Sequence, residues 1–368
     1  MEQRNIGIAL SGGGIRAMVF HLGLFKWLAE HNLFEQVKRV SSVSGASLCV
    51  GMIYAHNNLK WPTSEEFLGT VLPLVEKALH RDLQLAAIIK LIISPAYWNK
   101  RVNVIARVLE SKWGVHGKLS DLAGDTMWYV NCTTYETGKR FRFCKENMGD
   151  YIIGYVENPD ISLSEVMAAS AGFPVLIGPY CLKTGSYHWT PSYYSGEKWH
   201  PPACKTLHLW DGGVYDNFGF ESVFKPDDSG SLREGLDFII VSNASASIKL
   251  YDNRKGDFFV KRLKRILDIS MDQVAALRSR SVMEFIKRTN QGVYMKIGNS
   301  SEMITTASMC HEEFKAQLIE RCLSADQAKK SMNYPTTLKK PKDTDYQLLL
   351  RHGYEVADCT FQCYQTSI

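Results

Sequence analysis

The chain has 368 residues, of which 45% are hydrophobic and 22% are charged. This composition excludes intrinsic disorder and collagen-like repeats, and the length allows one large domain or two small ones, each able to bury a core. Lys and Arg number 43 against 38 Asp and Glu, which gives a net charge of +5. Spread evenly, this excess is too small to argue for a nucleic-acid partner, and we expect none.

The N-terminal segment and the cysteines indicate the cellular compartment. Residues 1–5 run straight into an apolar segment and lack the three regions of a signal peptide, so we expect a cytoplasmic protein. The nine cysteines are scattered and include no CxxC pair, which argues against a disulfide framework and a structural zinc site. No apolar run reaches about 18 residues, so we expect no transmembrane helix. We expect neither a metal nor a cofactor.

The apolar pattern of the first 55 residues predicts strands that alternate with helices. The predicted order is strand 6–10, a glycine loop, helix 15–30, strand 37–43, a tight turn and helix 48–55. Because strand, helix and strand follow one another in this way, we expect an α/β fold with a parallel or mixed sheet and helices on its faces.

Further elements are predicted along the rest of the chain. They are a hairpin from 128–134 and 140–143, a helix 164–170, strands 206–210 and 237–242, a helix 258–289, a strand 293–297 and a closing helix 343–357. With no repeat and no linker, we expect one domain over 1–368. It would carry a helical insertion at about 62–118 and a less recognisable C-terminal part at about 296–368.

A glycine loop follows the first predicted strand. Gly12, Gly13 and Gly14 precede the predicted helix 15–30, where backbone N–H groups and the helix dipole favour an anion. The spacing Gly12-x-Gly14-x-x-Ala17 matches a dinucleotide-binding fingerprint, but the second strand ends in serines instead of the required carboxylate. The alternative is an oxyanion hole, in which glycine N–H groups bind the oxygen that becomes negative during acyl transfer.

The second predicted strand ends at a candidate nucleophile. The run Ser42-Val43-Ser44-Gly45-Ala46 occupies the strand-to-helix turn of a G-x-S-x-G elbow, with Ser at the first glycine position and Ala at the last. Both replacements are small, so the strand and the helix can still pack closely. Ser44 is therefore the candidate nucleophile, and the hydroxyls of Ser47 and Ser42 are the alternatives.

A serine needs a base to become a nucleophile, and Asp211 is the best-placed candidate. It follows an apolar strand and opens an Asp-Gly-Gly sequence, whose glycines let the backbone turn sharply and leave the carboxylate at a sheet edge. An ordinary Asp-Gly turn is the other interpretation. His311 and His352 come late enough to complete a triad, but no recognisable acid precedes either of them in a strand-end loop.

Together, the glycine loop, the serine elbow and the Asp-Gly-Gly sequence resemble the patatin-like phospholipase family, in its bacterial branch. The small-residue run 168–174 is also similar to a segment of that family. The resemblance implies a three-layer α/β fold with a central mixed, mostly parallel sheet flanked by helices. The chain departs from the family pattern in two ways: the elbow lacks both consensus glycines, and Ser11 stands where an Asp often precedes the glycine loop.

The resemblance also implies a role for each site residue, and no histidine among them. Ser44 would attack the ester, Asp211 would accept its proton, and an oxyanion hole would be formed by Gly12, Gly13, Gly14 and Arg16. The implied substrates are membrane phospholipids or other acyl-ester lipids. One alternative is a membrane-degrading bacterial defence effector of the same chemistry that a cyclic nucleotide activates. Another is a nucleotide-binding module that uses the glycine loop.

Two segments bear on contact with lipid. Residues 83–93 are nearly all apolar and lead into an aromatic end at Trp98, so they form either a buried helix or a lid that touches lipid. Residues 254–288 hold ten Lys/Arg and four Asp/Glu, a net charge of +6, with an apolar stripe at helical spacing. We expect this second segment to be a core-facing helix with a solvated basic back; the alternative is a peripheral surface for anionic phospholipid.

Overall fold

A mixed ten-stranded sheet forms the centre of the computed structural model, which describes residues 4–87, 101–172, 178–191, 199–226, 230–248, 250, 259–308 and 312–364. The strands are β1 (Ile6–Leu10), β2 (Val37–Val43), β3 (Met127–Thr134), β4 (Arg140–Phe143), β5 (Asn147–Asp150), β6 (Gly154–Glu157), β7 (Tyr180–Lys183), β8 (Thr206–Asp211), β11 (Phe238–Asn243) and β12 (Gly292–Lys296). A separate small hairpin joins β9 (Phe224–Lys225) and β10 (Ser231–Leu232).

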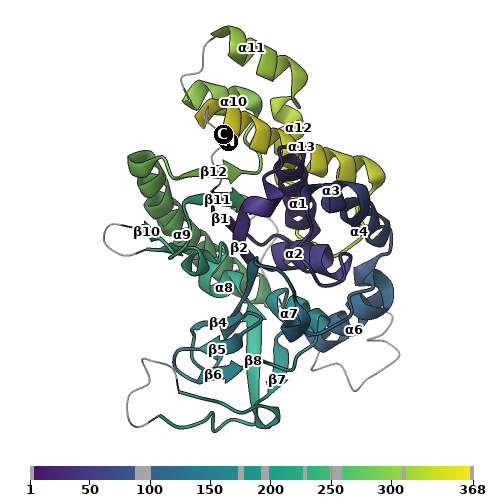
Figure 1. Ribbon diagram of the computed structural model, residues 1–368, viewed down its shortest axis with the longest axis vertical. Helices are drawn as coiled ribbons and strands as arrows, with labels where there is room; N and C mark the ends of the chain where they lie inside the picture. The colour runs from purple at the N-terminus through teal and green to yellow at the C-terminus, as the bar shows by residue number, and fades with distance from the viewer. Residues whose placement is uncertain are drawn as a thin grey trace.

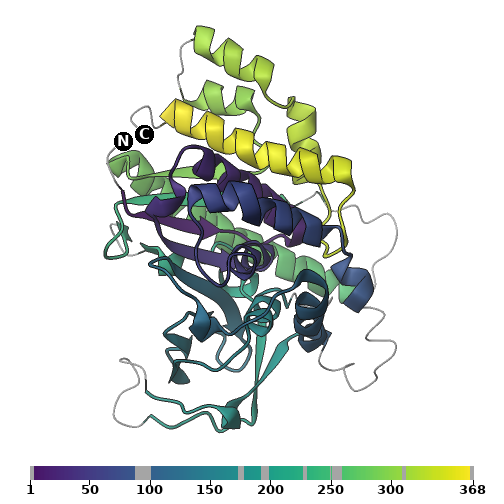
Figure 2. The same ribbon diagram turned by 45° about the vertical axis from the view of Figure 1, so that its right-hand side comes forward.

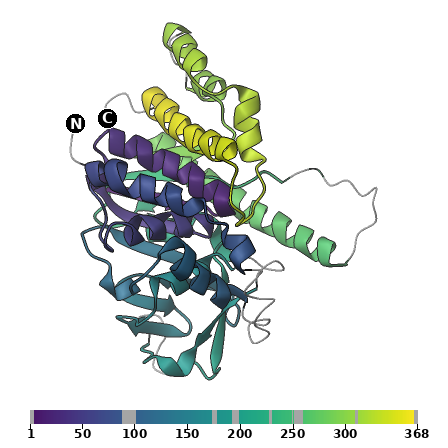
Figure 3. The ribbon, with the colours of Figure 1, turned by 90° about the vertical axis from the view of Figure 1, so that its right-hand side faces the viewer.

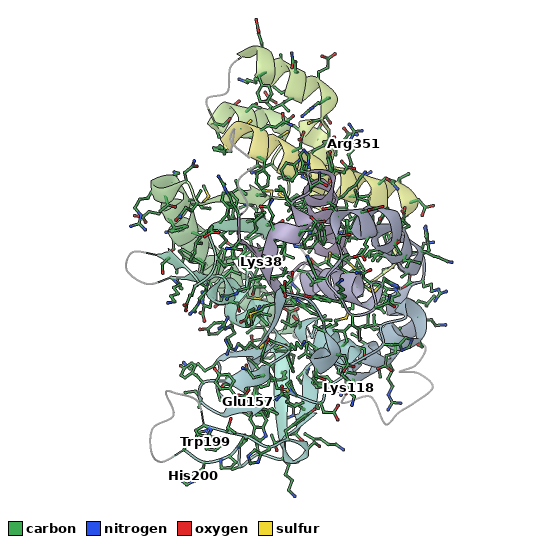
Figure 4. All side chains as sticks on the ribbon, viewed as in Figure 1. Lys38, Lys118, Glu157, Trp199, His200 and Arg351 are labelled. Carbon is green, nitrogen blue, oxygen red and sulfur yellow. The ribbon has the colours of Figure 1, made fainter. Side chains whose placement is uncertain are left out.

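The sheet has a parallel half and an antiparallel half. Strands β12, β11, β1, β2 and β3 lie side by side in that order and are parallel. Beyond β3, the strands β4, β5 and β6 continue as an antiparallel meander, while β8 pairs antiparallel with β3 and β7 with β8. Figure 1 shows the antiparallel half at the lower end, where Figure 4 labels Trp199 and His200.

Helices cover both faces of the parallel half. The helices are α1 (Gly14–Glu30), α2 (Gly45–Ala55), α3 (Ser64–Glu66), α4 (Leu72–Leu79), α6 (Arg101–Trp113), α7 (Leu163–Ser170), α8 (Gly213–Asp216), α9 (Phe259–Thr289), α10 (Ser301–Ala307), α11 (Glu312–Arg321), α12 (Ala325–Met332) and α13 (Asp343–Tyr364). Short 3-10 or π turns lie at Phe34–Gln36, Phe67–Val71, Leu119–Asp121, Thr184–Ser186 and Phe220–Ser222. Among the described residues, none of the helices is long and apolar enough to cross a bilayer.

Alternate side chains of β1 belong to two separate cores. Ile8 and Leu10 pack in the larger core with α1, α2 and α13, whereas Ala9 packs in a smaller one with Val282 and Phe285 of α9. Because both faces are covered, every residue of β1 is buried. The structure therefore has three layers, which confirms the predicted α/β fold with a mixed sheet flanked by helices.

Helix α13 lies along α1 in direct backbone contact. A Cβ added at Gly353 would lie 1.9 Å from the carbonyl oxygen of Phe20, and one added at Gly23 would lie 2.1 Å from that of Leu350. Figures 2 and 3 show the yellow α13 beside the purple α1, with the other C-terminal helices stacked on its far side. Glycines at this crossing let the C-terminal helices pack closely on the N-terminal half of the chain.

Most predicted elements are present, with shifted ends in some cases. Strands 6–10 and 37–43 are found at the predicted bounds, while the helix predicted from residue 48 begins at Gly45 and the closing helix extends to Tyr364. Strands β5, β6 and β7 were not predicted, and the weakly periodic segment 299–341 holds the helices α10, α11 and α12.

The apolar run 83–93 is described only in part. Leu83 is buried and Leu85 is exposed; residues 88–100, including Trp98, lie outside the described residues.

Replacing Gly353 by alanine tests the close packing of α13 on α1. The added methyl group overlaps the Phe20 carbonyl, so the two helices must separate, and we expect the free energy of unfolding to fall by about 1–3 kcal/mol. Urea denaturation measures the change. Gly185→Ala is the matched control because a Cβ there meets nothing within 4 Å; equal stability of the two variants would contradict the packing.

Candidate active site

Ser44 lies on the tight turn between β2 and α2. Its backbone has φ 55° and ψ −121°, a conformation that residues with a side chain rarely adopt. Such strain is typical of the nucleophile elbow, where it pushes the serine hydroxyl out of the turn above the end of the sheet. The residue is half-buried.

The glycine loop lies against this turn, backbone to backbone. A Cβ added at Gly45 would lie 2.0 Å from the carbonyl oxygen of Gly14, and one at Gly12 would lie 2.9 Å from Cβ of Ser44. Glycine is therefore required on both sides of the contact. The structure thus brings together the serine and the loop, which are about 30 residues apart in the chain.

Asp211 is brought next to the turn at Ser44 by β8, which runs antiparallel to β2. Strand β2 pairs with β3 as far as Asn131 of β3. From Cys132 onward β3 pairs with β8 instead, and Cys132 lies opposite Asp211. Since β4 occupies the other edge of β3, the strands β2 and β8 meet end to end on one edge. The last residue of β8 therefore lies next to the turn that holds Ser44.

The Asp211 carboxylate is fully buried, and this burial raises its pKa to about 6. Two contacts oppose the rise: hydrogen bonding from the Ser44 side chain, and the Gly213 N–H, which donates to Oδ1 at 2.8 Å. Oδ2 is buried and has no partner at good hydrogen-bond geometry among the described residues. The Ser44 hydroxyl is thus near the carboxylate without making a well-formed bond, as is common for catalytic pairs before substrate binds.

Ser170, at the end of α7, is hydrogen-bonded to the backbone of the turn that holds Ser44. Its Oγ accepts the backbone N–H of Ser44 at 2.9 Å and donates to the carbonyl of Asn131 at 2.8 Å. Two residues on, the Gly172 carbonyl accepts the N–H of Asp211 at 3.0 Å. The sequence pointed to this small-residue run without giving it a role; in the structure it supports both the serine and the aspartate.

Within the glycine loop, two N–H groups have partners and two do not. Gly12 donates to the Asn217 carbonyl at 3.1 Å, and Ile15 donates to the Thr337 carbonyl at 2.9 Å. The N–H groups of Gly13 and Gly14 donate to no acceptor within the described parts of the chain.

The Arg16 side chain connects the loop to two segments that are distant in the sequence. Its Nε donates to the Ala244 carbonyl at 3.0 Å, and its Nη1 donates to the Tyr334 carbonyl at 2.6 Å. Burial lowers the pKa of this guanidinium to about 10. Arg16 therefore holds the shape of the glycine loop through its side chain.

The other candidate serines are already engaged. Ser42 and Ser47 are fully buried, and their hydroxyl oxygens lie 2.9 Å apart; the Trp128 indole also donates to Ser42 at 2.8 Å. Neither is exposed to solvent as Ser44 is, so the structure favours Ser44.

Two buried histidines make contacts elsewhere in the fold. His352 accepts the Gly298 N–H at 2.9 Å, and the buried His21 bridges Ser11 and Ser242, with its pKa lowered to about 4 by burial. His311 lies outside the described residues. The described parts of the chain also hold no cluster of three His, Cys, Asp or Glu side chains able to bind a metal ion.

Comparison with known proteins agrees with this fold and arrangement. A model of the family described as patatin-like phospholipase matches residues 8–224, more than half of the chain. The chain therefore belongs to the patatin-like phospholipase family, as its resemblance predicted. No curated protein matches it by sequence.

Solved structures with the same fold include human GIVD cytosolic phospholipase A2. It has a TM-score of 0.53 and 13% identity, covering 99% of this chain and 63% of that one. The same enzyme in complex with methyl gamma-linolenyl fluorophosphonate inhibitor and terbium chloride has a TM-score of 0.51 and 15% identity, covering 99% of this chain and 60% of that one. The chain thus spans less than two thirds of the length of these structures.

The buried carboxylate predicts a pH-dependent gain in stability for Asp211→Asn. Because the folded pKa of about 6 exceeds the ordinary value of 3.8, ionisation of Asp211 disfavours the fold as pH rises through this range. Removing the charge should therefore raise the free energy of unfolding at pH 7 by up to about 3 kcal/mol. At pH 4 most of this gain should be lost, because the carboxyl is then protonated in the folded state and partly protonated in the unfolded state. Urea denaturation of both proteins at pH 4 and 7 measures this, and a pH-independent difference would contradict the raised pKa.

Proposed function

We propose that this protein hydrolyses fatty-acyl esters of phospholipids or related lipids, with Ser44 as nucleophile and Asp211 as base. The observation that carries the proposal is the meeting of a strained, half-buried serine with a buried carboxylate beside a glycine loop that has two available N–H groups. Membership of the patatin-like phospholipase family supports a lipid ester as substrate.

The proposed reaction has two halves. Asp211 accepts the Ser44 proton as Oγ attacks the ester carbonyl, and the N–H groups of Gly13 and Gly14 bind the developing oxyanion. The proton then passes from Asp211 to the departing alcohol, which leaves an acyl-serine. Water enters, Asp211 takes its proton, and the acyl chain departs as a fatty acid while the proton returns to Ser44.

The alternative of a nucleotide-binding module receives less support. A phosphate at the N-terminus of α1 would need the first N–H groups of that helix. The Thr337 carbonyl already accepts one of them, and its oxygen would lie 2.6 Å from a Cβ at Gly14. One of the helix N–H groups that a phosphate would need is therefore already paired.

Activation by a cyclic nucleotide stays a prediction. A cavity of about 610 Å³ lies between α1, α11 and α13, and Arg321 and Arg351 line it. Both arginines form ion pairs within the cavity wall, with Asp358 and Glu355. Since these carboxylates neutralise the two guanidinium groups, the cavity gives no argument for an anionic ligand.

Covalent labelling tests the nucleophile. A fluorophosphonate should modify Ser44, and peptide mapping by mass spectrometry should find the adduct on that residue. Ser44→Ala should abolish both labelling and ester hydrolysis while leaving the circular dichroism spectrum unchanged.

Ser47→Ala is the matched control for that experiment, because Ser47 lies three residues after Ser44, in α2, but is buried against Ser42 and Ser170. This variant should still be labelled at Ser44. An adduct on Ser47, or full hydrolysis by Ser44→Ala, would refute the assignment.

The raised pKa of Asp211 predicts the pH profile of hydrolysis. A base must be ionised, so kcat/KM on a soluble ester should be constant above about pH 7 and fall about tenfold per pH unit well below pH 6. Asp211→Ala should remove most of the activity at every pH. A profile with its midpoint near pH 4 would mean that the group acting as base is not the buried Asp211.

A further inference from the structure

The solvent-facing side of α9 is mainly charged in the C-terminal half of the helix and carries large apolar side chains in the N-terminal half. In the C-terminal half, this side carries Arg280, Glu284 and Lys287, while Val282 and Phe285 face the core. This half is the core-facing helix that the sequence predicted. The N-terminal half differs, because there the apolar side chains face solvent.

Among the described side chains of α9, five large apolar ones are exposed, four of them in the N-terminal half of the helix. Their exposed fractions are 73% for Phe259, 47% for Leu263, 64% for Ile266, 43% for Ile269 and 61% for Leu277. Phe259, Leu263 and Ile266 have the spacing of one helix face. The sequence predicted that the apolar side chains of this helix face the core. That prediction is wrong for the N-terminal half of α9, because the sheet that buries the C-terminal half does not extend to it. Figure 3 shows the green α9 projecting past the other helices and strands.

Basic residues accompany these apolar ones. Between residues 259 and 271 the helix has four Lys or Arg and a single acid, Asp268, which pairs with Lys264 at 2.6 Å. Lys261 and Arg262 are exposed. An apolar face bordered by cations fits the boundary between head groups and acyl chains of an anionic bilayer. A second copy of the chain would bring the same cations together, which like-charge repulsion disfavours.

The projecting half of α9 begins beside the candidate active site. Cε of Met271 would lie 3.0 Å from a Cβ at Gly213, two residues after Asp211. From Met271 to Phe259 the helix extends about 18 Å, at 1.5 Å per residue. A bilayer in contact with this half would therefore lie near the serine and the aspartate.

We propose that the exposed N-terminal half of α9 is the surface that docks this protein on membranes rich in anionic phospholipid. This proposal rests on the proposed function, because docking on a membrane would bring lipid esters to Ser44. Its test does not depend on hydrolysis, because binding is measured with Ser44→Ala protein, which leaves the vesicles intact.

The experiment is co-sedimentation with vesicles made of equal parts phosphatidylcholine and phosphatidylglycerol. The Ser44→Ala parent should bind these vesicles and not vesicles of phosphatidylcholine alone. Adding the three changes Phe259→Ser, Leu263→Ser and Ile266→Ser should weaken binding by about tenfold or more, because the inserted apolar area is lost. Lys261→Glu with Arg262→Glu should weaken it as well and reduce its dependence on salt.

Two matched controls separate docking from general damage. Ile152→Ser removes an exposed apolar side chain between β5 and β6, and Arg280→Glu with Lys287→Glu changes charges on the C-terminal half of α9; both should bind like the parent. In protein with an intact Ser44, the triple serine change should leave hydrolysis of a soluble ester as it was.

Three results would overturn the proposal. They are unchanged vesicle binding by the triple variant, equal loss of binding in the controls, and a parent dimer that becomes monomeric in the triple variant during sedimentation velocity. The last result would make this face an interface between two copies. If instead ester hydrolysis is absent but binding follows the predicted pattern, the proposed function fails and the docking surface stands.

Discussion

The candidate site depends on two strands that run toward each other along one edge of β3. β2 ends opposite Asn131 and β8 ends opposite Cys132, so the chain must turn away from the sheet twice at nearly the same point. One turn holds Ser44 and the other follows Asp211. The register of two strand pairs therefore determines how close the hydroxyl and the carboxylate are, and small residues around both turns make the approach sterically allowed.

Two unfavourable features of the fold lie where β2 and β8 end. Ser44 has a strained backbone, and Asp211 keeps a carboxylate where burial disfavours its charge. Each is supported by its surroundings: Ser170 accepts the Ser44 N–H, and the Gly213 N–H donates to Asp211. Strain and a perturbed pKa at one place are more typical of a functional site than of a structural one. The large core formed with α1, α2 and α13 supplies the stability that this arrangement requires.

Local patterns were enough to predict the parts of the site that lie within a few residues of one another. The glycine loop, the elbow at Ser44 and the two first strands each have a sequence signature, and β1 and β2 are found at the predicted bounds. The support from Ser170 was not predictable, because it depends on the distance between α7 and β2. Periodicity correctly predicted α9 as a helix but not the exposure of Phe259 and Leu263, since an apolar stripe looks the same whether or not anything covers it.

The central claim is that Ser44 and Asp211 form an interacting pair in the resting protein. Titration of the Asp211 carboxyl carbon by NMR, in protein labelled with carbon-13 at aspartate and assigned with Asp211→Asn, tests it most directly. We expect a pKa near 6 that rises further in Ser44→Ala, because the serine lowers the pKa of this carboxyl. An ordinary aspartate pKa near 4, or a pKa that is unchanged in Ser44→Ala, would contradict it.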